Sequence, residues 1–327
     1  MKKICILTCG GTITMKKNEN DTLVPLLKGD VLLKKIPYLS QIANISVNEV
    51  INIDSTNVEP NFWTKLAFII RDNYQKYDGF VITHGTDTMA YTASAVSFAL
   101  SNLNKPIIFT GSQKTIDDRP TDAESNLINA VLISTYDIAG VLIVFGSKIL
   151  LGSRSTKISE SNLDAFDSPM VSPLGMISLG IELYNFPKKI KKINPLICKA
   201  DFNKDVVIVV VAPGLNSLFL EKMLNECEGI ILLAYGPGNI PQSLLTLLKK
   251  DRELRKPVII VSQCKKGSTK MHLYEFGSQA LDCGAIPGND MTIESAVTKL
   301  MWLLGQTKNI NIIKKAFQKN YFGEVTV

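Results

Sequence analysis

Short apolar runs alternate with amphipathic stretches along most of this 327-residue chain, and this alternation limits the fold more than any other feature. Apolar runs of about four to eight residues bounded by turn residues are typical of buried strands, and their alternation with helical segments predicts a parallel α/β sheet. In the first half we expect buried strands at residues 4–8, 46–53, 79–83, 106–110 and 140–145, and helices at 61–77, 88–100 and 122–136.

A second cycle of the same pattern follows a stretch of lysines and prolines. Its expected strands are 206–212, 229–233 and 257–261, and its expected helices lie near 217–226 and 243–249. The length fits two domains of about 150 residues each. We therefore predict a two-domain, three-layer α/β fold: a larger catalytic domain (1–190) with a mostly parallel sheet and flanking helices, a linker (191–205), and a smaller parallel α/β domain (206–327).

The helix expected at residues 122–136 carries a start signal and an apolar face. Thr121 and Glu124 have the spacing of a capping box. Leu127, Ile128, Val131 and Leu132 follow on one helical face, which indicates packing against the core rather than chemistry.

The chain is mildly basic, with 36 Lys and Arg against 30 Asp and Glu and a net charge of +6. Its densest basic run, at residues 188–192, could be a nucleic-acid patch or a solvated linker between domains. The run contains no arginine and no interleaved aromatic residue, which favours the linker. We expect no nucleic-acid partner.

The six cysteines contain no Cys-x-x-Cys pair and no histidine at ligand spacing, so we expect neither metal nor cofactor. Most should be buried thiols in a reducing compartment. The N-terminal Met-Lys-Lys and the apolar run after it mimic a signal peptide, but that run ends at Thr8 and is needed as the first strand. The most apolar segment, 206–212, is far shorter than the roughly 20 residues of a membrane helix. We predict a cytoplasmic protein with no membrane partner.

Two motifs place threonine hydroxyls directly after expected strands. Gly-Gly-Thr-Ile at residues 10–13 ends the first, and His-Gly-Thr-Asp-Thr at 84–88 follows the strand 79–83. Ligands collect at the carboxyl ends of strands in open α/β sheets. Gly85 permits a tight turn, and Thr88 is the predicted cap of the helix that begins near Met89. Either motif alone is compatible with an ordinary strand–turn–helix connection, but the two together indicate an enzyme rather than a binding module.

These motifs, together with three further segments, resemble the successive signatures of the bacterial-type L-asparaginases. The other three are Asp-Ser-Thr at 54–56, Thr-Gly-Ser-Gln at 110–113 and Ser-Thr-Lys at 155–157, and the similarity extends to Asp-Met-Thr at 290–292. Within that family the chain is most similar to the cytoplasmic type I enzymes, because it begins directly on the first strand and carries Tyr-Gly-Pro-Gly-Asn at 235–239.

Amide hydrolysis without a metal requires a nucleophile, a proton-transfer group and donors for the oxyanion. His84 and His272 are the only histidines, and we interpret His84 as a packing or hydrogen-bonding residue. The resemblance implies that Thr12 is the nucleophile, that Thr86, Asp87 and Lys157 form a supporting relay, and that Asp87 also binds the substrate ammonium group. Without the resemblance, Lys157 would be an ordinary surface lysine.

By the same resemblance, Ser55 and Thr56 bind the α-carboxylate, and backbone N–H groups around Thr86 bind the oxyanion. Asn239 reaches the site of a neighbouring subunit, which implies a homodimer or homotetramer. The full set of implied substrate-binding residues is Gly11, Asp54, Ser55, Thr56, Thr86, Asp87, Ser112 and Asn239.

The chain departs from the family in one respect. A tyrosine is usual in the loop after the first strand, but residues 21–25 contain none. The loop is then degenerate with reduced activity, or a tyrosine comes from elsewhere. Tyr274 resembles a tyrosine that some cytoplasmic members use from the second domain or a neighbouring subunit; the alternative is a tyrosine packed on the core. We expect the polar segment 14–28 to be a mobile lid.

Three interpretations of function remain at this stage. The leading one is hydrolysis of L-asparagine to L-aspartate and ammonia through an acyl-threonine, with a weaker action on L-glutamine. The second is the asparaginase-like subunit of a tRNA-dependent amidotransferase, which carries a substantial domain before its Gly-Gly-Thr motif, whereas here the motif begins at residue 10. The third is a non-catalytic amino-acid or nucleotide sensor with the glycine-rich corner as an anion site. No Walker lysine follows that corner.

Overall fold

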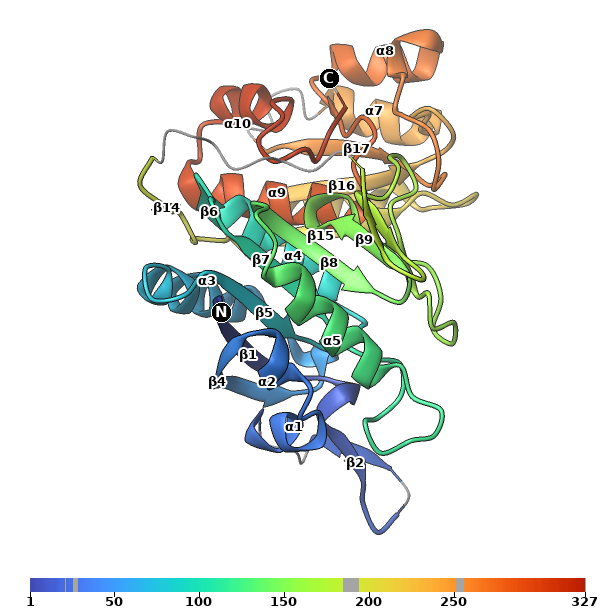
Figure 1. The fold of residues 1–327 in the computed structure, drawn as a ribbon. Coiled ribbons are helices and arrows are strands. Elements are labelled where there is room, and N and C mark those ends of the chain that lie inside the picture. Colours follow the sequence, from blue (N-terminus) through green and yellow to red (C-terminus); the bar gives the residue numbers. More distant parts are fainter. Residues whose placement is uncertain (21, 26–28, 185–193, 251–255, 327) are drawn as a thin grey trace. The chain divides into compact units, whose positions relative to one another are not determined.

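The computed structural model describes residues 1–20, 22–25, 29–184, 194–250 and 256–326. The chain divides into two compact units, Met1–Ala200 and Asp201–Val327, and each is built on its own sheet (Figure 1). The α/β class with two sheets is therefore confirmed. The lysine run at 188–192 and the start of the expected linker at 191–193 lie outside the described residues.

The sheet of the first unit is mostly parallel. Its strand order is β13-β12-β9-β8-β7-β5-β1-β4. The parallel strands are β4 (Asn44–Ile53), β1 (Lys3–Gly10), β5 (Gly79–Thr83), β7 (Pro106–Thr110) and β8 (Gly140–Phe145). The sequence pattern did not predict the antiparallel extension formed by β9 (Lys148–Leu151), β12 (Gly175–Ile177) and β13 (Ile181–Leu183).

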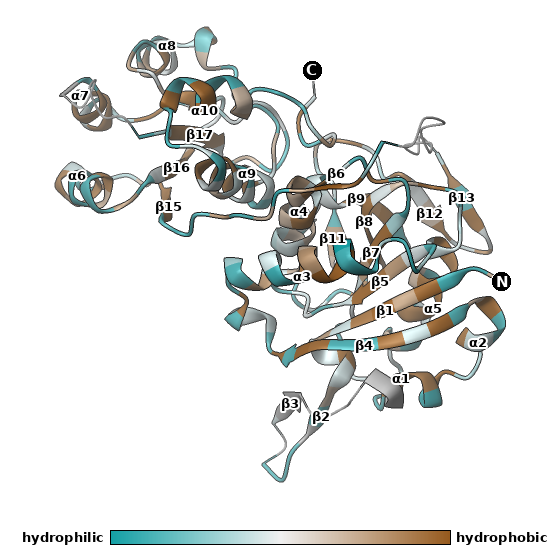
Figure 2. Cartoon of the chain, turned by 90° about the vertical axis from the view of Figure 1, so that its left-hand side faces the viewer, coloured by the Kyte–Doolittle hydropathy of each residue, from teal (hydrophilic) through white to brown (hydrophobic). Residues whose placement is uncertain are grey.

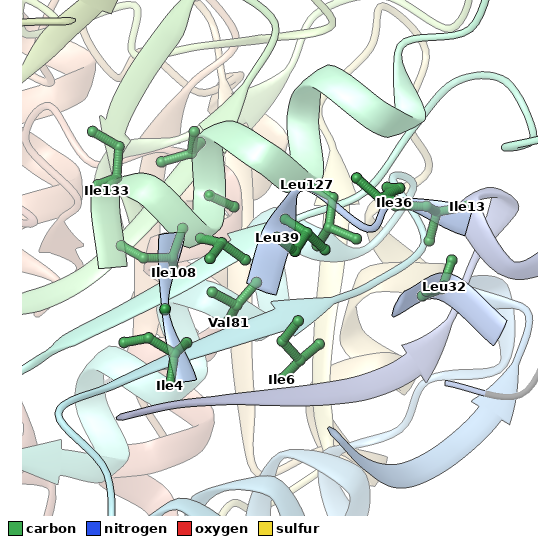
Figure 3. Close-up of a cluster of buried hydrophobic side chains, with 14 of the residues drawn as sticks. Ile4, Ile6, Ile13, Leu32, Ile36, Leu39, Val81, Ile108, Leu127 and Ile133 are labelled. Carbon is green, nitrogen blue, oxygen red and sulfur yellow. The ribbon is translucent and has the colours of Figure 1, made fainter. Parts of the chain in front are cut away.

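Helices cover both faces of this sheet. On one face, α5 (Ala123–Ser134) packs on β5, β7 and β8, together with α1 (Gly29–Lys35) and α2 (Leu39–Ile42). Figure 3 shows this core, in which Ile4, Val81 and Ile108 of neighbouring strands lie near Leu127 and Ile133 of α5. On the other face, α4 (Met89–Ala99) packs on β7 and β8, and α3 (Pro60–Asn73) packs on α4. Central strands covered on both sides must be apolar throughout, and β5 and β7 are buried at every position.

Two expectations for this unit were wrong. The strand β4 is not buried, because it forms the edge of the sheet and only Val50 is buried among its ten residues; its hydrophilic positions are visible in Figure 2. The capping box of α5 does not form. Thr121 accepts a hydrogen bond from the Ala123 N–H at 3.1 Å, but Asp122 is the N-cap residue, so Glu124 is one residue too close to reciprocate.

The order of the parallel strands creates a switch point beside β1. The chain passes from β1 to β4 on one side and then to β5 on the other. Loops at the carboxyl ends of the two strands therefore diverge, which leaves the crevice where ligands bind in open α/β sheets. The motifs at residues 10–13 and 84–88 begin at these two strand ends.

The segment after β1 contains more regular structure than expected for a polar loop. Residues 12–14 form a 3₁₀ turn, η1 (Thr12–Thr14), and β2 (Met15–Lys17) pairs with β3 (Leu23–Pro25) in an antiparallel hairpin. Residues 21 and 26–28 of the expected lid lie outside the described residues. Its mobility stays a prediction.

The second unit has a four-stranded parallel sheet in the order β15-β16-β17-β18. On one face pack α6 (Ser217–Glu226), α7 (Gln242–Lys250) and α8 (Glu275–Asp282), and α9 (Ile293–Gln306) contacts the strands from the other. The helix α10 (Ile310–Phe317) follows α9. The strands are β15 (Val206–Val210), β16 (Gly229–Ala234), β17 (Val258–Ser262) and β18 (Ile286–Pro287).

The cysteines are less uniformly buried than expected. Cys5, Cys9 and Cys227 are buried, Cys198 and Cys283 are half-buried, and Cys264 is exposed in the loop after β17. Within the described residues, no helix is both long and apolar enough to cross a membrane. That part of the chain also contains no group of three or more His, Cys, Asp or Glu side chains placed to hold a metal ion.

Candidate active site

Three loops meet at the switch point beside β1, and glycines allow the contact. A Cβ on Gly11 would lie 2.5 Å from the Gly85 backbone nitrogen, and a Cβ on Gly85 would lie 2.5 Å from Ser55 Oγ. Gly11 also has a φ of 83°, a conformation that side chains with a Cβ disfavour. The loops after β1, β4 and β5 are therefore in van der Waals contact, and no larger residue fits at either glycine.

Thr12 comes directly after Gly11 and is the first residue of η1. The turn is closed by Thr14, whose hydroxyl donates to the Gly11 carbonyl at 3.0 Å. Thr12 itself is half-buried, whereas Ile13 and Thr14 are buried. The structure thus places Thr12 just after the carboxyl end of β1, next in sequence to the glycine that contacts the loop carrying residues 84–88.

The residues Thr86, Asp87 and Lys157 form one connected group. Lys157 Nζ donates to Thr86 Oγ1 at 2.8 Å and to Asp87 Oδ1 at 2.7 Å. The lysine lies in β10 (Thr156–Lys157), which pairs with β11 (Phe166–Asp167), about seventy positions after its partners. The Lys157 side chain is 19% exposed and that of Asp87 is 57% exposed. Lys157 is therefore not an ordinary surface lysine, whereas the Asp87 side chain remains largely accessible to solvent.

The segment 54–56 is held by its own side chains. Asp54 is the N-cap of the 3₁₀ turn η2 (Ser55–Asn57), and its Oδ1 accepts the Thr56 N–H and hydroxyl at 2.9 Å each. Thr88 occupies the N-cap position of α4, as expected, but its side chain accepts no hydrogen bond from the helix N–H groups. Its hydroxyl instead donates to the Ser55 carbonyl at 2.8 Å. The bond ties the loop after β5 to the loop after β4.

The segment 111–114 is anchored to the start of α5. Asp122 accepts the N–H groups of Gln113 at 2.9 Å and Lys114 at 3.0 Å. Ser112 is buried and its hydroxyl donates to the Lys114 carbonyl, within its own loop. Thr86 donates its hydroxyl to Gln113 Oε1 at 3.2 Å. The sequence alone pointed to no separate role for Gln113, although it lies within one of the five motifs.

His84 is buried and supports the loop from beneath. Its ring lies 2.8 Å (Nδ1) from the Gly85 carbonyl and 3.0 Å (Nε2) from Thr92 Oγ1, which also accepts from Trp63 Nε1 at 3.2 Å. The Gly85 carbonyl can only accept, so the proton of the neutral imidazole sits on Nδ1, and Thr92, which accepts the indole hydrogen, donates its own to Nε2. Burial lowers the pKa of His84 to about 4. The packing and hydrogen-bonding role predicted for His84 matches these contacts.

Two of the predicted site residues, Asn239 and Tyr274, belong to the second unit. Asn239 lies in the loop after β16. The loop is closed by the Asn239 backbone N–H, which donates to the Tyr235 carbonyl at 2.9 Å. Tyr274 is the N-cap residue of α8 and is 54% exposed. The interpretation of Tyr274 as a tyrosine packed on the core is therefore wrong.

Two family models match the chain: "Asparaginase, N-terminal" over residues 3–189 and "Glutaminase/Asparaginase C-terminal domain" over residues 205–317. The chain is 34% identical to L-asparaginase of Thermococcus kodakarensis, with 99% of each chain covered. It is also 34% identical to L-asparaginase 1 of Escherichia coli K12, covering 99% of this chain and 98% of that protein. A glutamyl-tRNA(Gln) amidotransferase subunit of Pyrococcus abyssi is 32% identical, and the match spans all of this chain but 77% of that protein.

Solved structures agree with the sequence matches. The thermostable L-asparaginase from Thermococcus kodakarensis superposes with a TM-score of 0.92 over 99% of each chain at 33% identity. A probable cytoplasmic L-asparaginase from Campylobacter jejuni superposes with a TM-score of 0.82 at 27% identity, over 98% of this chain and all of that one. The two-domain architecture is therefore shared with proteins that the resemblance had indicated.

Proposed function

The chain belongs to the asparaginase family, and from this premise we propose that it is an L-asparaginase that hydrolyses L-asparagine to L-aspartate and ammonia. The group Thr86–Asp87–Lys157 carries the proposal, because it supplies a charged and hydrogen-bonded relay beside the Thr12 loop. A sensor would need no such relay.

The reaction proceeds in two halves. Thr12 Oγ1 attacks the side-chain amide carbon, and the resulting oxyanion is held by backbone N–H groups around Thr86. The C–N bond then breaks, ammonia leaves with the proton that Thr12 gave up, and an acyl-threonine remains. Water attacks the ester carbon, its proton returns to Thr12, and L-aspartate is released. The relay through Thr86 and Lys157 moves these protons.

The charged ends of the substrate find partners on two of the three loops. Asp87 is half-exposed and uses Oδ1 for Lys157, so Oδ2 can accept the substrate ammonium. The segment 54–56 lies across the Gly85 contact, and the Ser55 hydroxyl and local amides bind the α-carboxylate. Gly11 and Ser112 complete the walls of this pocket. We place this chemistry in the domain 1–190, and we assign neither a metal nor a cofactor to it.

The deciding experiment measures ammonia release from L-asparagine, L-glutamine and buffer, each without tRNA. We expect release from L-asparagine and slower release from L-glutamine. Thr12→Ala should abolish turnover and leave the melting temperature unchanged, because only one small hydroxyl is lost. Full activity in that variant would remove Thr12 from the mechanism.

The second candidate function is the ammonia-supplying subunit of a tRNA-dependent amidotransferase, which the match to the amidotransferase protein of Pyrococcus abyssi favours. It predicts that ammonia release from L-asparagine is negligible until a partner subunit and tRNA are added. Robust release by the isolated protein supports the asparaginase.

We further propose that the protein acts in the cytoplasm as a homodimer or homotetramer, with no nucleic acid or membrane partner. Asn239 would reach the site of a neighbouring subunit, and Tyr274 is exposed enough to serve as the tyrosine that the loop after β1 lacks. Light scattering tests the assembly. A strictly monomeric, fully active protein would refute the role given to Asn239.

A further inference from the structure

Two threonines face each other where the pairing between β1 and β5 ends. The register of these parallel strands runs from Ile4 and Gly79 to the pair Thr8 and Thr83. Beyond this pair the two strands continue into the loops that carry residues 10–13 and 84–88. The threonine pair therefore lies at the base of the crevice between these loops.

Both threonine side chains point into the core beneath α5. Side chains alternate between the two faces of a strand, and paired residues of parallel strands share a face. The core covered by α5 contains Ile6 of β1 and Val81 of β5 (Figure 3). Thr8 and Thr83 lie two positions further along the same strands, so they face the same core. Thr8 is 3% exposed and Thr83 is fully buried.

The two hydroxyls are orphaned in this apolar setting. Within the part of the chain that the structure describes, neither Thr8 Oγ1 nor Thr83 Oγ1 has a hydrogen-bond partner. Thr110 on β7, the register partner of Thr83, is satisfied instead, because its hydroxyl donates to the Val144 carbonyl at 2.8 Å. Burying a hydroxyl without a partner destabilises the folded state. Two orphaned hydroxyls on paired residues point to a partner that they share.

The spacing of the pair fits one water molecule. Neighbouring strands lie about 4.8 Å apart, and a water bonded at about 2.8 Å to each of two hydroxyls can span up to about 5.6 Å. Buried waters bond to polar groups that would otherwise be unsatisfied. Each hydroxyl can donate or accept, so a neutral water suits both. Two hydroxyls supply too few oxygen ligands for Ca²⁺ or Mg²⁺.

The start of α5 leaves room above the pair. This helix runs antiparallel to the strands, because a Cβ on Gly79 would lie 2.7 Å from the carbonyl of Ser134, its last residue, whereas Asn126 near its start bonds to Gly111 after β7. The first turn of α5 therefore lies towards the carboxyl ends of the strands. Its first residue is Ala123, a buried member of the same core, and a methyl side chain occupies little of the space there.

We propose that Thr8 and Thr83 bind one buried water that bridges the carboxyl ends of β1 and β5. The water joins the two strands at the last pair before the loops of the candidate site diverge, and it satisfies both hydroxyls at once. This inference goes beyond the proposed function and does not depend on it, since the site is part of the core whether or not the protein hydrolyses an amide.

A double-mutant cycle tests the shared partner. Thr8→Val and Thr83→Val each delete a hydroxyl and keep the branched shape, which suits a strand, so both variants should fold. We expect each single change to lower the folding equilibrium constant at least about 5-fold in urea unfolding, because the water loses one partner and the other hydroxyl is stranded. The double variant should be no less stable than the less stable single variant, since no polar group then remains to be satisfied.

Thr110→Val provides the matched control. It makes the same substitution in the same row but removes a separate bond, to the Val144 carbonyl. Thr110 lies two strands from Thr8, about 10 Å away. The effects of Thr8→Val and Thr110→Val on the equilibrium constant should therefore multiply to within about 2-fold. Trp63 on α3, in a Trp302→Phe background, reports unfolding of the first unit.

Crystal structures of the unmodified protein and of the double variant identify the partner. We expect a water within about 3.2 Å of both hydroxyls in the unmodified protein and no water at that place in the double variant. Solitary hydroxyls predict the opposite stabilities: each single variant would be at least as stable as the unmodified protein, and the two effects would multiply. That result would overturn the proposal, and so would a direct bond between the two hydroxyls with no water beside them. Ammonia release enters none of these measurements, so failure of the proposed function leaves the test intact.

Discussion

Acidification should destabilise the first unit, and the contribution of His84 to this loss can be worked out from its pKa. Burial lowers the pKa of His84 from 6.5 to about 4, while the unfolded chain keeps the ordinary value. Between these two pH values the unfolded state binds more protons than the folded state. Stability is therefore intact above about pH 6.5 and is lost as the pH falls towards 4.

The size of the loss follows from the two pKa values. Between pH 7 and pH 5 the His84 contribution to the free energy of unfolding falls by about 2 kcal/mol, because each unit of pKa difference is worth about 1.4 kcal/mol. The limiting loss, reached well below pH 4, is about 3.5 kcal/mol by the same conversion. His84→Gln should cost about 1–3 kcal/mol at pH 7, since it disturbs the bonds to Gly85 and Thr92. It should also remove most of the loss between pH 7 and pH 5.

The assay is urea unfolding followed by tryptophan fluorescence at the two pH values. In a Trp302→Phe background Trp63 is the sole reporter, and it lies in the His84 hydrogen-bond chain. His272→Gln is the matched control, because His272 is exposed, and it should leave the pH dependence unchanged. Carboxylates that titrate near pH 4 contribute equally to all three proteins. If His84→Gln loses as much stability between pH 7 and pH 5 as its parent, the buried neutral imidazole is not the cause.

Three further outcomes test other parts of the structure. Asp87→Asn should raise KM and lower kcat for L-asparagine, because the partner of Lys157 and of the substrate ammonium is lost; an equal loss of affinity for the analogue without the α-amino group would contradict ammonium binding. Tyr274→Phe should lower kcat at least about 10-fold if the exposed phenol serves the reaction, and an unchanged kcat and melting temperature would refute this. Lys299→Met should destabilise the second unit by about 3–5 kcal/mol in urea unfolding, because it leaves the fully buried Glu324 carboxylate without its cation, and Lys299→Met/Glu324→Gln should recover part of the loss if that explanation holds.

The central strands were predictable because burial on both faces leaves a plain signature. The expected ranges 79–83, 106–110 and 140–145 coincide with β5, β7 and β8. The antiparallel strands β12 and β13 have three residues each, which is too short for a periodic pattern to register. The edge position of β4 depends on strand order, and the sequence pattern alone does not encode that order.

The sequence predicted which segments form the site, but not the hydrogen bonds that these segments make with one another. The five segments identified the loops, yet Thr88 bonds to the Ser55 carbonyl where a helix cap was expected. Capping rules consider only hydrogen-bond partners near in sequence, and Ser55 lies 33 positions away. Gln113 was missed for the same reason, since its partners at 159–162 are 46 to 49 positions distant.

The pentapeptide at residues 84–88 shows why these motifs are so specific in composition. Each of its five residues makes a specific contact: His84 bonds to the Gly85 carbonyl, Gly85 leaves no room for a Cβ beside Ser55, Thr86 lies between Lys157 and Gln113, Asp87 pairs with Lys157, and Thr88 bonds to the Ser55 carbonyl. Four of the five residues contact other loops: Gly85 and Thr88 meet Ser55, and Thr86 and Asp87 meet Lys157, so the pentapeptide is held from more than one side. We therefore expect a change at any one position to move the Thr86 hydroxyl relative to the nucleophile loop. Because hydrogen bonds weaken steeply with misalignment, such a shift affects the rate before it affects the fold.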